Sequence, residues 1–118
     1  MKKMKKILLV FLVALSLNGF AQQKDLVWHT DVNKAINIST QSGKPLFLFF
    51  TGSDWCGWCK KLKKAVFDTD TFRKWANENV ILFELDYPRR TPQDPAIKKQ
   101  NAELQQTFRG LVRGYPTV

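Results

Sequence analysis

Two short apolar runs stand out in the pattern of hydrophobic and polar positions along the chain. The first is "PLFLFF", Pro45 to Phe50, and the second is "VILFELD", Val80 to Asp86. Short runs of branched and aromatic residues without polar alternation are typical of strands that are buried on both faces of a sheet. We predict a strand at each run, and the two strands should be parallel because helical patterns lie between them.

Four amphipathic segments surround these strands, and each carries residues that favour helix boundaries. Asp31, Asp70 and Asp94 can act as N-caps, Gly43 suits a helix end, and Pro95 suits a first helical position. We predict helices over Asp31 to Ser42, Cys59 to Phe67, Thr71 to Glu78 and Asp94 to about Phe108. Helices that alternate with strands define the α/β class.

The same periodicity predicts which apolar side chains of the helices face the core. These are Val32, Ala35 and Ile36 in the first helix, Leu62, Ala65 and Val66 in the second, Phe72 and Trp75 in the third, and Ile97, Leu104 and Phe108 in the fourth. The last ten residues, "RGLVRGYPTV", predict a turn followed by an extended segment.

The N-terminal residues follow a different pattern. Met1 to Lys6 carries four lysines, Ile7 to Leu17 is an uncharged run of 11 residues, and Gly19 and Ala21 supply small residues beyond it. This order is typical of a secretory signal peptide. An uncleaved anchor is disfavoured, because spanning a bilayer takes about 20 apolar residues. We predict a signal peptide at residues 1–21 and one domain at 22–118. The protein would contact the membrane only through the signal peptide, during export.

Charge changes the picture little. Without residues 1–21 the formal charge falls from +9 to +5, since 15 basic and 10 acidic residues remain. The basic residues are scattered over several short clusters. A solvated surface explains them better than a nucleic-acid site, which would also be an unusual task for an exported protein.

The two cysteines of the chain, Cys56 and Cys59, lie in "TGSDWCGWCKKLKK". A structural disulfide between them would close a very small loop and would stabilise the fold weakly. Haem attachment requires a histidine after the second cysteine, where Lys60 stands instead. Zinc needs about four ligands, so it would have to be shared between two chains. Haem attachment is therefore excluded, while a structural disulfide and a shared zinc site stay open beside a redox pair.

The surroundings of the pair favour redox chemistry. It follows a predicted buried strand and opens a predicted helix, so Cys56 would lie at the helix N-terminus, where unpaired backbone N–H groups favour a thiolate. Lysines of "KKLKK" add positive charge nearby, although they equally suit the solvent-exposed face of the helix. Cys59, one turn further, would be more shielded and suited to resolving a mixed disulfide.

The motif "DWCGWCKKL" after a buried strand, together with the distant "GYPTV", resembles the thioredoxin superfamily. It is most similar to exported thioredoxin-like proteins with a Trp-Cys-Gly-Trp-Cys-Lys site. The resemblance covers about Asp25 to Val118 and implies a thioredoxin-like fold, a central sheet flanked by helices. It also implies that this chain stops before the last two strands and the C-terminal helix of that fold.

The resemblance assigns roles by position. Cys56 is implied as the attacking nucleophile and Cys59 as the resolving thiol of a redox-active disulfide. Pro116 corresponds to a cis-proline that lies against the pair, and the backbone of Tyr115 to a strand-like substrate contact. The implied substrate-binding residues are Trp55, Gly57, Trp58, Tyr115 and Pro116. Ordinary packing is the alternative for the two tryptophans.

One residue departs from the family pattern. Thioredoxins carry a buried acid six positions before the first cysteine, and this chain has Phe50 there. Asp54 or Glu84 could take over the proton of the resolving thiol, but no motif places either of them.

Taken together, these residues lead to the hypothesis of an exported, periplasmic or secreted thiol–disulfide oxidoreductase. The expected direction is reduction of disulfide-containing protein substrates, with a membrane or thioredoxin-type electron donor and with no cofactor, metal or nucleic acid. The oxidase or isomerase direction and a non-catalytic binding module remain alternatives.

Overall fold

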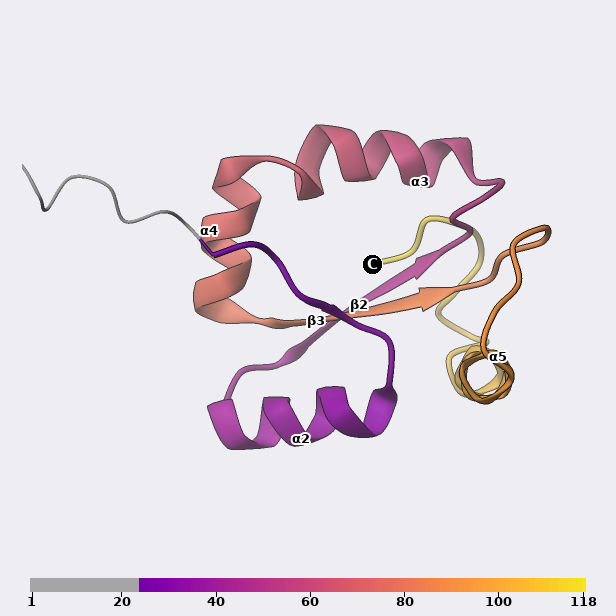
Figure 1. Cartoon of the computed structure of the whole chain (residues 1–118), viewed down its shortest axis with the longest axis horizontal. Helices are drawn as coiled ribbons and strands as arrows, with labels where there is room; N and C mark the ends of the chain where they lie inside the picture. The colour runs from indigo at the N-terminus through magenta and orange to yellow at the C-terminus, as the bar shows by residue number, and fades with distance from the viewer. Residues whose placement is uncertain (1–23) are drawn as a thin grey trace, which may run out of the picture.

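The computed structural model of the protein describes residues 24–118. Three parallel strands form one sheet in this range, in the order β1–β3–β2. They are β1 (Trp28–His29), β2 (Leu46–Thr51) and β3 (Ile81–Asp86). Helices cover both faces of the sheet, which confirms the predicted α/β class (Figure 1). The predicted signal peptide lies outside the described residues.

The helices form two layers. On one face lie α3 (Gly57–Leu62), the π-helical turn η1 (Lys63–Phe67) that continues it, and α4 (Asp70–Asn79). On the other face lie α2 (Val32–Ser42) and α5 (Pro95–Thr107), as Figure 1 shows. No helix within residues 24–118 combines the length and the apolar character that crossing a membrane requires.

The two predicted strands are confirmed, with β3 in the centre. The register runs from Leu46 opposite Ile81 to Thr51 opposite Asp86. Since side chains alternate across a strand, Phe49 packs on the α3 side and Phe50 on the α2 side. The sheet therefore separates two apolar clusters, and the cysteines belong to the cluster beneath α3 and α4.

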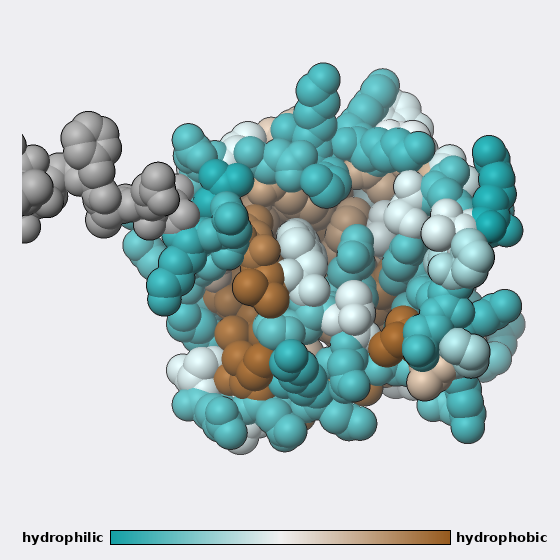
Figure 2. Space-filling view, in the orientation of Figure 1, coloured by the Kyte–Doolittle hydropathy of each residue, from teal (hydrophilic) through white to brown (hydrophobic). Residues whose placement is uncertain are grey.

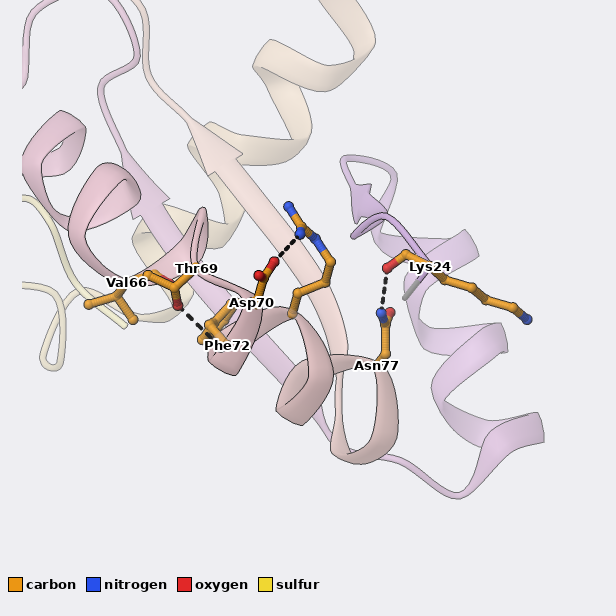
Figure 3. Close-up of polar contacts among 7 residues, drawn as sticks. Lys24, Val66, Thr69, Asp70, Phe72 and Asn77 are labelled. Atoms are coloured by element: carbon orange, nitrogen blue, oxygen red, sulfur yellow. Dashed lines mark hydrogen bonds and ion pairs between the residues drawn. The ribbon is translucent and has the colours of Figure 1, made fainter. Parts of the chain in front are cut away.

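Most of the predicted capping residues are confirmed at the observed ends of the helices. Asp31 caps α2 by accepting from the backbone N–H of Lys34, and Gly43 ends that helix with a left-handed φ of 70°. Asp94 caps α5, and Pro95 occupies its first position. The prediction for α4 is wrong by one residue, because the hydroxyl of Thr69 is the cap that accepts from the N–H of Phe72 (Figure 3).

The predicted inward face of the second helix is wrong at its end. Ala65 and Val66 are exposed, and Phe67 is buried in their place. The reason is the π-helical turn, in which the N–H of Asp68 bonds to the carbonyl of Lys63 five residues back. One extra residue in the turn moves the inward position from Val66 to Phe67.

Two further apolar residues predicted to face the core are exposed, namely Ile36 in α2 and Trp75 in α4. The surface seen in Figure 2 is mostly hydrophilic, with hydrophobic residues showing in separate patches. Single exposed apolar side chains of this kind are normal on a folded protein. Helical period alone did not distinguish the edge of the apolar stripe from its centre.

The C-terminal residues return to the sheet. Thr117 forms an isolated antiparallel bridge with Phe50, through backbone bonds of 2.9 and 3.3 Å. The Tyr115–Pro116 peptide bond just before it is cis. This bridge places the Tyr115–Pro116 segment beside the carboxyl end of β2, which is the end that leads to the cysteines.

Candidate functional site

Cys56 and Cys59 form a disulfide with their Cα atoms 5.3 Å apart. Both are buried, with exposures of 5% and 3%. A turn from β2 delivers them, closed by a 2.9 Å bond from the N–H of Cys56 to the carbonyl of Gly52. Cys56 is the N-cap of α3, and its Sγ accepts from the backbone N–H of Cys59 at 3.2 Å.

The tryptophans beside the cysteines have different environments. Trp58 is 70% exposed, and the Nζ of Lys61 lies 4.5 Å from its ring centroid. Trp55 is half-buried, and its Nε1 donates to the carbonyl of Tyr87 at 2.8 Å. Gly57 is exposed in the first turn of α3. Gly57 and Trp58 are therefore the exposed residues of the Cys56–Cys59 segment, and both cysteines are buried.

The ring of Trp55 is enclosed by residues from distant segments. Gly52 lies so close that a Cβ there would be 2.1 Å from Cε2 of the indole. The Tyr115 ring packs edge-on at 5.5 Å. The guanidinium of Arg89 lies over the indole at 3.9 Å. Ordinary packing thus accounts for much of the environment of Trp55.

Asp54 organises the loop after β3. Its carboxylate accepts from the backbone N–H groups of Arg89, Arg90 and Thr91 at 3.0, 2.7 and 2.8 Å. These bonds to the charged form, the one to Arg89 first, hold the pKa of Asp54 well below its usual value. A carboxylate held ionised in this way is a poor proton acceptor, so Asp54 does not replace the missing acid.

The second acid beside the turn is Asp86 at the end of β3. Its two oxygens accept from the N–H and the hydroxyl of Ser53 at 2.8 and 2.5 Å. Asp54 and Asp86 therefore tie the cysteine turn and the 87–94 loop together. Nothing in the sequence pattern indicated this role for either residue.

Glu84 is placed differently. It pairs in register with Phe49, so its side chain lies on the face of the sheet that carries the cysteine cluster. Burial, and then the charge of Asp86, raise the pKa of Glu84, while Lys63 partly opposes them. Of the two acids considered from the sequence, Glu84 is the one whose pKa is shifted toward tighter proton binding.

Phe50, at the position of the usual acid, is 3% exposed and belongs to the opposite cluster. It packs edge-to-face on Phe108 at 5.8 Å. Its role is core packing between the sheet and the end of α5.

Tyr115 lies between the two apolar clusters. Its ring is near those of Trp55 and Tyr87, at 5.5 and 5.7 Å, and its hydroxyl accepts from Nε2 of Gln105. The fold thus brings Trp55, the cysteine pair and the Tyr115–Pro116 segment to one end of the sheet. Within residues 24–118 no three potential ligands gather as a metal site would require.

Arg89 is the residue of this region that sequence analysis missed. The "PRR" stretch gave no signal beyond that of a loop. Its position over Trp55 depends on Asp54, which holds the loop, and the pattern of residues does not disclose that bond.

The chain belongs to a thioredoxin-like family, because residues 27–118 match the family model of that description. The predicted thioredoxin-like fold is confirmed. A solved structure described as DsbH Oxidoreductase has a TM-score of 0.70 and 31% identity to this chain, and covers 84% of this chain and 71% of the other.

Two curated relatives come from Chlamydia pneumoniae. The Thioredoxin-related protein DsbJ is 34% identical over 91% of this chain and 32% of its own length. The Disulfide bond reductase DsbH is 35% identical over 70% of this chain and 49% of its own length. The chain thus spans a third to a half of the length of these relatives.

Proposed function

We propose that this protein is a thiol–disulfide oxidoreductase that uses Cys56 and Cys59. The observation that carries the proposal is the buried disulfide at the start of α3, with the N–H of Cys59 directed at Sγ of Cys56. In the reduced protein the same N–H and the helix terminus stabilise a thiolate on Cys56. Membership of the thioredoxin-like family supports the assignment.

The reaction conserves electrons through thiol–disulfide exchange. The Cys56 thiolate attacks one sulfur of a substrate disulfide, forms a mixed disulfide and expels the other sulfur as a thiolate. Cys59 then attacks Sγ of Cys56 and expels the second substrate thiolate. The substrate gains two electrons, and the pair becomes the disulfide seen here. A membrane or thioredoxin-type donor restores the dithiol.

The direction we propose is reduction of protein disulfides, and the printed name of the relative DsbH supports it. Export to the periplasm or the exterior is supported by the leader-like pattern of residues 1–21. The oxidase or isomerase direction of the same chemistry is distinguished by the reduction potential of the pair. A value near about −270 mV agrees with a reductase, and one near about −120 mV with an oxidant.

Glu84 is the group that we propose for the proton of Cys59. Its place on the cysteine face of the sheet and its raised pKa support this role. A proton leaves Cys59 when it attacks the mixed disulfide, so an acceptor with a pKa nearer to neutrality is favoured. In this proposal Glu84 takes the role of the buried acid that thioredoxins carry at the position of Phe50.

Substrate contact is assigned to the residues at the open end of the site. Trp58 and Gly57 offer an exposed surface beside the sulfurs. Tyr115 and Pro116, beside the end of β2, offer backbone to an extended substrate segment, in the manner of strand addition. Trp55 supports this surface from beneath.

Insulin reduction by dithiothreitol tests the activity. The full protein should accelerate it, Cys56→Ser should abolish the acceleration, and Cys59→Ser should accumulate a mixed disulfide with insulin. Equal rates with and without the protein would overturn the enzyme proposal. That result would favour the alternative of a binding module, which the 70% exposed Trp58 also suits.

A further inference from the structure

Each tryptophan that precedes a cysteine carries a cation on its ring face. Lys61 lies over Trp58 at 4.5 Å, and Arg89 lies over Trp55 at 3.9 Å. The two cations come from separate elements, α3 and the loop after β3. Cation–aromatic contacts at these distances are attractive and restrict where the charge lies. Two positive charges are thereby held on the tryptophans that directly precede the two cysteines.

Arg89 is held more firmly than a surface arginine usually is. Its backbone N–H donates to Asp54, which fixes the loop, and its guanidinium rests on an indole that Tyr87 and Gly52 hold in place. A guanidinium stacked on a ring keeps its N–H groups available at the edge. Arg89 and Lys61 form no ion pair with any residue in the range 24–118.

The charge around this pair is positive. Lys60 on α3, Lys64 on η1 and Arg90 in the loop after β3 are exposed and carry further positive charge. The carboxylates of this region are Asp54, Asp86 and Glu84. The oxygens of Asp54 and Asp86 accept from backbone N–H groups of the turn and loop. Since neither Lys61 nor Arg89 forms an ion pair within residues 24–118, both cations can still bind a carboxylate from another molecule.

We propose that this cationic rim, formed by Lys61 and Arg89 on their tryptophans, selects protein disulfides whose cysteines are flanked by Asp or Glu. The inference rests on the proposed function and names its substrate class. Arg89 can bind a carboxylate through two parallel N–H groups, while Lys61 supplies a point charge on the other side. Attraction between the rim and an acidic substrate increases the rate of encounter.

The test uses three cyclic disulfide peptides that differ only in the residues flanking the cysteines, which are Glu, Gln or Lys. The rate constant for reduction by the pre-reduced full protein is measured for each and divided by the rate constant with dithiothreitol. This division removes the intrinsic reactivity of each disulfide. We expect the Glu peptide to react at least about tenfold faster than the Lys peptide at low salt, with the ratio approaching one in about 1 M salt.

Charge reversal locates the effect. The double variant Lys61→Glu/Arg89→Glu should invert the preference toward the Lys peptide. The matched control is Lys34→Glu/Lys98→Glu, which makes the same change of charge on α2 and α5, on the opposite face of the sheet. The control should keep the preference of the natural chain. Lys61→Gln/Arg89→Gln, which introduces no new charge near Trp55, should bring the ratio close to one.

Equal normalised rates for the three peptides would overturn the inference. So would a control that shifts the ratio as far as the rim variant, because net charge would then be the cause. If no peptide is reduced by the protein at all, the proposed function fails. If the protein reduces all three peptides at equal normalised rates, only the proposed role of the cationic rim is contradicted, and the proposed function stands.

Discussion

Gly52 is the residue on which the position of Trp55 depends. A Cβ at this position would lie 2.1 Å from the indole, which real side chains do not tolerate. We expect Gly52→Ala to displace the Trp55 ring and to destabilise the protein by about 1–3 kcal/mol. Urea unfolding measures the loss. Gly57→Ala is the control, because a Cβ at Gly57 has no atom within 4 Å, and its effect should stay within about 0.5 kcal/mol.

Glu84 gives a residue-scale prediction that depends on pH. Its pKa in the folded protein is raised above the ordinary 4.5, so the folded protein binds the proton of this carboxyl more tightly than the unfolded chain does. The stability of the oxidised protein should therefore fall as pH rises from about 4.5 through the raised pKa. Glu84→Gln should lack this fall, and above that range it should be more stable than the natural chain.

Denaturant unfolding at a series of pH values measures this difference. Well below pH 4.5, where the carboxyl is protonated in both states, the two proteins should have similar stability. A difference that is independent of pH would mean that the ionisation of Glu84 is not its cause.

The junction between η1 and α4 is the element on which the second layer depends. The hydroxyl of Thr69 donates to the carbonyl of Val66 at 2.6 Å and accepts from the N–H of Phe72 at 3.2 Å (Figure 3). We expect Thr69→Ala to cost about 1 kcal/mol of stability, because it removes the cap. Thermal unfolding measures it. Thr69→Ser retains the hydroxyl and should recover most of the loss.

Figure 3 also shows how α4 holds the start of the described chain. The side-chain amide of Asn77 donates to the backbone carbonyl of Lys24 at 2.7 Å. On the same helix, Arg73 pairs with Asp70 one turn earlier. An exposed ion pair of this kind contributes little, so the cap and the burial of Phe72 stabilise the element more.

The 87–94 loop is an element without regular structure that Asp54 holds in place. We expect Asp54→Ala to speed hydrogen exchange at the amides of Arg89, Arg90 and Thr91, because all three donate to its carboxylate. Amide exchange followed by NMR measures the change. The amide of Ser53, which donates to Asp86, is the internal control. Unchanged exchange at all three positions would show that other contacts hold the loop.

At the scale of the whole fold, β2 lies at the edge of the sheet within residues 24–118 and has an apolar border. A groove of about 310 Å³ runs along it, lined by Leu46, Phe47, Leu48, Phe50, Phe108, Leu111, Val112, Thr117 and Val118. Edge strands with apolar borders promote association between chains. We expect the 118-residue chain to self-associate at high concentration, and Leu111→Lys to reduce this association, because Leu111 is 76% exposed.

Analytical ultracentrifugation over a range of concentrations measures the effect. Val27→Lys places the same charge on another exposed apolar residue, away from the groove, and should change association less. An equal effect of both variants would point to net charge as the cause.

The signals that predicted correctly are local ones. The two apolar runs became β2 and β3, and Asp31, Gly43 and Asp94 mark helix boundaries as expected. Capping and strand patterns depend on neighbours within a few residues, so they can be read from sequence. The two-residue β1 gave no such pattern, and the π-helical turn moved the inward position to Phe67.

By itself, the sequence determined the alternation of strands and helices and the place of Cys56 and Cys59 at the start of a helix. Both follow from short-range periodicity and spacing. Only the tertiary structure decided that Asp54 holds a loop, that Glu84 shares the cysteine face and that Arg89 covers Trp55. Those relations join segments far apart in the chain, and register and packing set them rather than local preference.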